Sequence, residues 1–154
     1  MVASGDVVTL DRDVRLAVYL GFVDDGRPPA PPEIARTLGV GTSTVEASLR
    51  RLADAHVLVL APGTPYVWMA NPFSAIPTPF SVRTAARDYW GNCIWDALGI
   101  AACLGTDARI DTFCPDCVES LSLQVRDGVL ESPAEGAIHF AVPAAHWWDD
   151  IGST

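Results

Sequence analysis

Apolar residues follow a mixed pattern in the first quarter of the chain, at positions 14, 16, 18, 20, 22 and 23. They lie between charged ends in Asp11–Asp25, and these ends predict a helix that Asp11 caps and Gly26 ends. The proline-rich residues 28–32 follow. A second, shorter helix is expected over Glu33–Leu38, because a proline is favourable just before or at the first helical position.

A longer helix and a hairpin are predicted next. Thr42–Ala55 opens with a Thr or Ser as N-cap, and Glu46 is placed to reach back to Ser43. The apolar residues of this segment share one face at i, i+4 and i+7: Val45, Leu49 and Leu52. Val57–Leu60 and Tyr66–Met69 are separated by a Pro-Gly-Thr-Pro turn, which predicts a hairpin.

The order of helix, short helix, longer helix and hairpin predicts a winged helix-turn-helix-like domain over residues 1–70. In a DNA-reading protein Thr42–Thr44 would open the recognition helix, and Arg50 and Arg51 would contact phosphates. Residues 28–70 balance three arginines against three acids, whereas a duplex reader usually shows a basic stripe. We therefore expect a structural or covering role, with a metal-responsive winged-helix regulator as an alternative.

The second half has a different pattern. A proline-rich crossing over residues 71–80 leads into a small mixed strand and helix domain over residues 81–154, so the fold class is α+β. Asp88–Leu104 is apolar nearly all round, which predicts a buried helix. Strands are predicted where apolar and polar residues alternate: Ala108–Phe113, Ser120–Arg126 and Gly136–Val142.

Charge and hydropathy exclude several classes of protein. All ten basic residues are arginine, and with 19 acids they give a formal net charge of −9. This balance argues against nucleic acid or an anionic membrane as a partner. No apolar run approaches the roughly 18 residues that a membrane span needs. Residues 1–12 lack the basic-then-apolar pattern of an export signal, so we expect a cytoplasmic protein.

The candidate chemistry lies in the acidic second half, which holds all four cysteines: Cys93, Cys103, Cys114 and Cys117. Cytoplasmic thiols stay reduced, so free thiols are expected. Cys93 and Asp96 are three residues apart on the predicted buried helix and therefore share a face. Burial would raise the pKa of the carboxyl and suit it to hold or pass a proton. The alternative is a small buried thiol beside a carboxylate that caps a neighbouring loop.

Cys114-Pro-Asp-Cys117 lies between two predicted strands. Two thiols at this spacing on a hairpin loop resemble half of a zinc knuckle or a redox pair. A structural zinc ion needs two further ligands, and the remaining candidates are isolated: Cys93, Cys103, His56, His139 and His146. Zinc at Cys114 and Cys117 thus stays open, and the sequence requires no cofactor.

Several motifs together resemble the organomercurial lyase (alkylmercury lyase) family: WGNCIWDALGI, ARIDTFCPDC and HWWDDIG, after a winged-helix-like first half. The resemblance covers about residues 12–152. It implies an enzyme that protonates a carbon–mercury bond and releases a hydrocarbon and Hg(II), with the first domain covering the site. By matching motifs it implies that Cys93 is the first catalytic cysteine and Asp96 the catalytic proton carrier.

The family's second catalytic cysteine follows the DDIG segment, and the sequence reaches Thr154 without it. The second sulfur is then expected from Cys114, from Cys117 or from an external thiol. This gives a metal-binding set of Cys93, Asp96, Cys114 and Cys117 with Hg(II) as bound product. An absent terminal element would leave apolar surface for a second copy to cover, as a homodimer. The alternative is a non-catalytic homologue that binds a metal or a thiol-bearing ligand through its cysteines.

Overall fold

Three helices and a small sheet make up the first half of the molecule. The computed structural model describes residues 4–132 and 136–152. The helices are α1 (Ser4–Asp25), α2 (Pro31–Leu38) and α3 (Thr42–Asp54). The strands β1 (Val59–Leu60), β2 (Val67–Ala70) and β3 (Phe73–Ser74) follow in an antiparallel sheet of order β1-β2-β3. The predicted order of three helices and a hairpin is confirmed, while its assignment as a winged helix stays a prediction.

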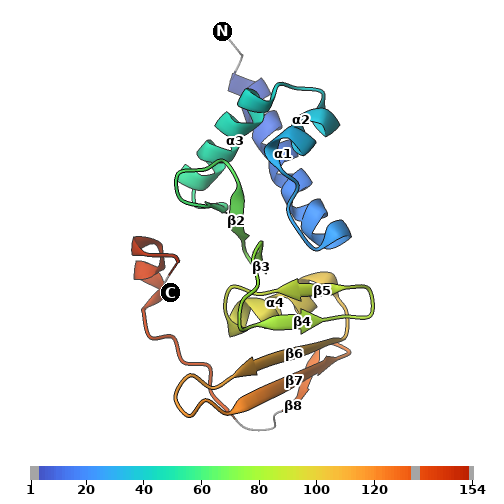
Figure 1. The fold of residues 1–154 in the computed structure, drawn as a ribbon, viewed down its shortest axis with the longest axis vertical. Coiled ribbons are helices and arrows are strands. Elements are labelled where there is room, and N and C mark those ends of the chain that lie inside the picture. The colour runs from blue at the N-terminus through green and yellow to red at the C-terminus, as the bar shows by residue number, and fades with distance from the viewer. Residues whose placement is uncertain (1–3, 133–135, 153–154) are drawn as a thin grey trace.

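The second half is a five-stranded antiparallel sheet with one helix on a face (Figure 1). Its elements are β4 (Ser81–Arg83), β5 (Asp88–Trp90), α4 (Ile94–Leu104), β6 (Ala108–Phe113), β7 (Ser120–Arg126) and β8 (Val129–Ser132). The strand order is β5-β4-β6-β7-β8, and α4 packs against β4 and β6. A 3₁₀ helix, η1 (Ala144–Asp149), lies near the end of the chain. The α+β fold class is thus confirmed, as are the bounds of the two longest strands.

Helix α1 begins earlier than the sequence predicted. It starts at Ser4, so Asp11 lies within the helix and does not cap it. Asp11 instead accepts hydrogen bonds from the buried Ser48 hydroxyl at 2.6 Å and from Arg51 Nε at 2.9 Å. Gly26 follows the end of the helix at a φ of 72°, as predicted. Within residues 4–132 and 136–152, no helix is both long and apolar enough to cross a membrane.

Replacing Asp11 with alanine is expected to cost about 1–3 kcal/mol of stability, because it leaves the buried Ser48 hydroxyl and the Arg51 guanidinium without this acceptor. The Arg51 hydrogen bond lowers the pKa of Asp11. The contribution of the ionised Asp11 carboxylate to the free energy of unfolding is therefore fully present above the unfolded carboxyl pKa of about 3.9. It is lost as the pH falls through the lower pKa of the folded state. Urea unfolding at pH 7 and pH 3 measures both effects.

The matched control is Asp13→Ala, which removes an exposed acid that pairs only with its neighbour Arg12 at 3.0 Å. Such pairs are worth little, so its stability should stay within about 0.5 kcal/mol of the wild type. Equal losses in the two variants would contradict the role given to Asp11.

The start of α3 also differs from the prediction. Its N-cap is Gly41, and Glu46 forms an ion pair with Arg50 at 3.6 Å and does not reach back to Ser43. Gly41 already gives the extended backbone that a cap needs, so the serine becomes helical. Arg51 pairs with an acid of α1. The two arginines expected to contact phosphates in a DNA-reading protein are thus paired with acids of the same chain, and the expectation against DNA binding stays a prediction.

The predicted helix over Asp88–Leu104 is wrong in its first part. Asp88–Trp90 forms β5 and pairs with β4, and the helix begins only at Ile94. Aromatic residues are favoured in strands, and here the pairing with β4 outweighs the apolar run. The helix is also less buried than predicted: Trp95 is 59% exposed. Its fully buried side is narrow: Ala97, Ile100 and Ala101.

A strand was predicted in the wrong place near the end of the chain. Gly136–Val142 forms no strand, and the edge of the sheet is β8 (Val129–Ser132). The β7–β8 turn has Asp127 at a φ of 47° and Gly128 at 75°, and Asp-Gly is favoured in two-residue hairpin turns of this kind. That dipeptide between alternating residues is the signal that the sequence analysis missed.

One hydrophobic core joins the two halves of the chain. Phe22 of α1 stacks on Phe73 of β3 with ring centroids 5.1 Å apart, and Phe73 contacts Tyr89 of β5 at 5.5 Å. The Tyr89 hydroxyl also donates to the Val23 carbonyl at 3.2 Å. Helix α1 is therefore packed against the strand-rich half. The predicted division at residues 71–80 stays a prediction, because the core is continuous across it.

The C-terminal segment, residues 136–152, runs back along the molecule toward the β1–β2 hairpin (Figure 1). Phe140 meets the ring of Trp95 edge-on, with centroids 6.3 Å apart. Further along, Trp148 stacks on His56 at 4.1 Å, and Gly152 lies against the ring of Trp68. This segment therefore contacts both the first helical turn of α4 and the first half of the chain.

Candidate functional site

The N-terminus of α4 holds the thiol and the carboxyl that the sequence singled out. Cys93 is the N-cap, with φ −144° and ψ −179°, and its sulfur accepts a hydrogen bond from the Asp96 N–H at 3.4 Å. Each side chain also shifts the pKa of the other, so the thiol and the carboxyl influence each other's proton. The expected proximity of Cys93 and Asp96 is therefore present. Cys93 is the N-cap that precedes the helix, however, so the two residues do not lie on one face of it as predicted.

Burial sets the proton affinity of both groups. It raises the pKa of Asp96 above that of an ordinary carboxyl, against the opposing effect of hydrogen bonds from Asn92 and Cys93. Burial also raises the pKa of the Cys93 thiol, although backbone N–H groups of Asp96 and Trp95 act the other way. The site therefore has a protonated thiol at neutral pH beside a carboxyl that takes up a proton more readily than usual.

A network of amides supports Asp96 from distant parts of the chain. The Asn92 side chain donates to Asn71 Oδ1 at 3.0 Å and to the Phe73 carbonyl at 3.3 Å, and it also bonds to Asp96. The Tyr19 hydroxyl of α1 donates to the Asn71 carbonyl at 3.1 Å. The sequence analysis missed these residues, and only the position of Asn92 directly before the thiol could have indicated one of them.

Tyr19 lies near enough to Asp96 for the two groups to influence each other. Burial is the main cause that raises the pKa of Tyr19, and the negative charges of Cys103 and Asp96 add to it. Arg15, whose guanidinium lies 5.7 Å from the centre of the Tyr19 ring, acts in the opposite direction. Helix α1 therefore contributes side chains to the surroundings of this site.

Aromatic rings lie beside the same helical turn. Trp95 directly follows the Cys93-Ile pair, and Phe140 contacts both Trp95 and Trp147, the latter at 5.3 Å. The Trp147 ring nitrogen donates to the Val142 carbonyl at 2.8 Å, which fixes that ring within its own segment. Trp147 of the HWWDDIG motif is thus linked through Phe140 to Trp95, two residues after the thiol.

The other cysteines lie elsewhere. All four are free: Cys103 is exposed on α4, and Cys114 and Cys117 lie in the β6–β7 loop. Backbone N–H groups of Cys117 and Asp116 lower the pKa of Cys114. In the described part of the chain no three His, Cys, Asp or Glu side chains form a group that could hold a metal ion. The structure therefore separates the predicted four-ligand set into two pairs.

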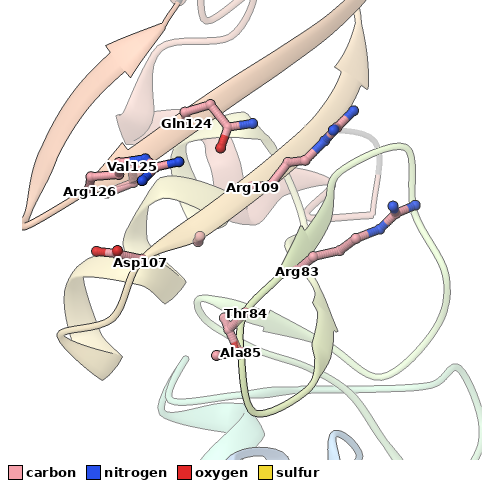
Figure 2. Close-up of a pocket in the computed structure, with 9 residues that line it drawn as sticks. Arg83, Thr84, Ala85, Asp107, Arg109, Gln124, Val125 and Arg126 are labelled. Atoms are coloured by element: carbon pink, nitrogen blue, oxygen red, sulfur yellow. The ribbon is translucent and has the colours of Figure 1, made fainter.

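A polar hollow of about 230 Å³ lies on the sheet (Figure 2). Three arginines contribute to its lining, from β4, β6 and β7: Arg83, Arg109 and Arg126. Arg109 donates a hydrogen bond to Asp111 at 2.9 Å, and Arg83 lies 3.8 Å from the same carboxylate. Arg126 pairs with Glu131 at 3.2 Å. Its lining includes no cysteine or histidine, so the thiol chemistry belongs to the start of α4.

Comparisons with known proteins indicate the family of the chain. The family described as "MerB: Alkylmercury lyase" matches residues 73–154. Among solved structures the chain is similar to "Crystal structure of the mercury-bound form of MerB2", with a TM-score of 0.63 and 22% identity. That match covers 80% of this chain and 58% of the other, so the chain spans less than two thirds of its length. No curated protein matches the sequence.

Proposed function

The chain belongs to the alkylmercury lyase family, and we propose from this that it cleaves carbon–mercury bonds. Cys93 is the mercury-binding thiol and Asp96 the proton carrier. The observation that carries the proposal is the close approach of Cys93 and Asp96 at the start of α4, where the Asp96 N–H donates to the Cys93 sulfur and each side chain shifts the pKa of the other. The substrate class is a small alkyl- or arylmercury compound bound to an external thiol.

In the first step the substrate R–Hg–SR′ exchanges its thiolate. Cys93 Sγ forms a bond to mercury, its proton moves to the Asp96 carboxylate, and R′S⁻ leaves. Soft thiolate sulfur has high affinity for soft metal ions, so this exchange is favourable. The carboxylate belongs to the residue whose backbone N–H already bonds to the Cys93 sulfur, so the proton acceptor is close to the thiol that gives up the proton.

In the second step the proton on Asp96 moves to the carbon atom. The electron pair of the Hg–C bond takes up that proton, the hydrocarbon R–H leaves, and Hg(II) remains on the Cys93 sulfur beside the Asp96 carboxylate. Burial raises the pKa of Asp96, so the carboxyl holds the proton more strongly than an ordinary carboxyl does until the carbon accepts it. An external thiol then removes Hg(II) and restores the starting pair.

The rate should show a bell-shaped dependence on pH, because the reactive pair is a protonated thiol beside a carboxylate. Activity falls on the acid side as Asp96 takes up a proton, and on the alkaline side as Cys93 loses its proton to solvent. Since burial raises both pKa values, both limbs are displaced to higher pH than for an ordinary carboxyl and thiol. Measuring kcat/KM for hydrocarbon release against pH checks this; an acid limb at an ordinary carboxyl pKa would contradict it.

The activity itself is tested by headspace gas chromatography of the full chain incubated with an alkylmercury salt and excess monothiol. Hydrocarbon release is expected from the wild type and not from Cys93→Ser. Cys103→Ser is the matched control, because Cys103 is an exposed thiol on the same helix and should not affect release. Bound mercury with no hydrocarbon from the wild type would reject the lyase and favour a non-catalytic binding protein.

A further inference from the structure

The loop between β6 and β7 has a backbone that brings two thiols together. The last strand pair is Phe113 with Ser120, and the Cys114 N–H donates to the Glu119 carbonyl at 2.8 Å beyond it. The Val118 N–H then returns to the Cys114 carbonyl at 2.8 Å. These bonds close a short loop that contains both Cys114 and Cys117.

The groups inside this loop are directed at one sulfur. Residues 115–117 form the turn between Cys114 and Val118, so Cys117 lies three residues after Cys114 within one tight loop, and its side chain and N–H lower the pKa of Cys114. Cys114 is half-buried, and Cys117 is exposed. The two thiols are therefore adjacent, unoxidised and open to solvent on one side.

The loop also holds an unfavourable backbone conformation next to the second thiol. Val118 has a φ of 60°, in the left-handed region that a β-branched residue rarely adopts. Such a conformation persists only where the surroundings fix it. Here the bond from the Val118 N–H to the Cys114 carbonyl fixes it, which holds the loop closed around Cys114 and Cys117.

The number of ligands selects the kind of metal. A structural zinc ion needs four, and within residues 4–132 and 136–152 no third His, Cys, Asp or Glu side chain completes a metal-binding group. Soft ions that accept two thiolates alone are satisfied by this pair. We propose that Cys114 and Cys117 form a second, two-coordinate site for Hg(II), separate from the pair at the start of α4.

Binding of added Hg(II) at this site replaces two S–H bonds with two S–Hg bonds and releases two protons to solvent. The proposal rests on the proposed lyase activity for its physiological source of Hg(II): an external thiol carries the ion from Cys93, and the loop thiols take it up by exchange, in which their two protons pass to the departing external thiolates. Binding of added Hg(II) does not depend on that activity, so the two ideas can fail separately.

The test uses the full chain with Cys93→Ser and Cys103→Ser, which leaves only the loop thiols. HgCl₂ is titrated in the presence of a competing monothiol, and three quantities are measured: thiolate–mercury charge-transfer absorbance, free thiols by labelling, and released protons. We expect one Hg(II) per monomeric chain, two thiols blocked and two protons released. One thiol blocked per ion, or mercury-linked dimers by size exclusion, would overturn the proposal.

Adding Cys117→Ser to this background leaves Cys114 and the rest of the loop in place. Loss of the second thiolate removes its intramolecular advantage, so affinity against the monothiol should fall by about 10²–10⁴-fold. Circular dichroism checks that the sheet is retained. Unchanged affinity, or displacement of Hg(II) by an equal concentration of Zn(II), would contradict a two-thiolate site. Hydrocarbon release by Cys114→Ser/Cys117→Ser in the otherwise wild-type chain should stay near the wild-type rate.

Discussion

Asp96→Asn is expected to stop hydrocarbon release and leave the alkylmercury group bound to Cys93. An amide cannot accept the thiol proton or deliver it to carbon, and loss of a positioned proton carrier costs about 10²–10⁴ in rate. The thiol can still exchange onto mercury by giving its proton to solvent. Mass spectrometry of the intact chain should therefore find the mass of one R–Hg group in this variant and little of it in the wild type during turnover.

The same substitution should make the fold more stable at neutral pH. Because burial raises the folded pKa of Asp96 above its unfolded value, stability falls as the pH rises through the window between the two values. Asparagine removes this charge and keeps the shape, so the gain in unfolding free energy is expected above that window and not below it. Urea unfolding at pH 4 and pH 8 measures the difference.

Asp88→Asn is the matched control, since Asp88 is an exposed carboxyl on the neighbouring strand. Neither its rate nor its stability should change appreciably. Hydrocarbon release by Asp96→Asn at the wild-type rate would show that the carboxyl takes no part in the reaction. An R–Hg adduct on a cysteine other than Cys93 would contradict the role of Cys93 as the mercury-binding thiol.

Gly91→Ala is expected to reduce both stability and activity, because the glycine lets β5 pass close to the start of α4. A Cβ at this position would lie 2.7 Å from the Ala97 backbone nitrogen and 2.9 Å from its Cα. Backbone cannot yield as a side-chain tip can, so α4 must move away from the sheet at a cost of about 1–3 kcal/mol. A displacement of about 1 Å in the reacting groups can lower the rate about 10²-fold.

Gly99→Ala provides the control on the same helix. Its Cβ would lie 3.4 Å from the Pro72 Cβ, which is an ordinary contact, and alanine is favoured over glycine in a helix by up to about 1 kcal/mol. Stability of Gly99→Ala should be equal to or above that of the wild type, with activity retained. If Gly91→Ala unfolds at the wild-type urea concentration and keeps its rate, the close packing does not position the site.

Local signals in the sequence were sufficient for much of the fold. Alternation over Ala108–Phe113 and Ser120–Arg126 predicted both strands with the observed bounds, and Gly26 and Gly39 marked the ends of two helices. The proximity of Cys93 and Asp96 was also predicted, since three residues span about one helical turn.

Pairing and packing between segments explain most of what could not be predicted. The apolar run that includes Tyr89 and Trp90 predicted a helix, and the hairpin pairing of Asp88–Trp90 with β4 makes it a strand. Asn71 and Tyr19 reach the site through tertiary packing, which no local pattern records. Spacing alone likewise could not show that the four predicted ligands do not come together in one group.

The most direct test uses a variant of the 154-residue chain that keeps Cys93 as its one cysteine, with Cys103, Cys114 and Cys117 all replaced by serine. With an alkylmercury salt and excess monothiol, this variant should release hydrocarbon near the wild-type rate, since one thiol and Asp96 perform the cleavage. Absence of release from the folded variant, or release that survives a further Cys93→Ser substitution, would contradict the account.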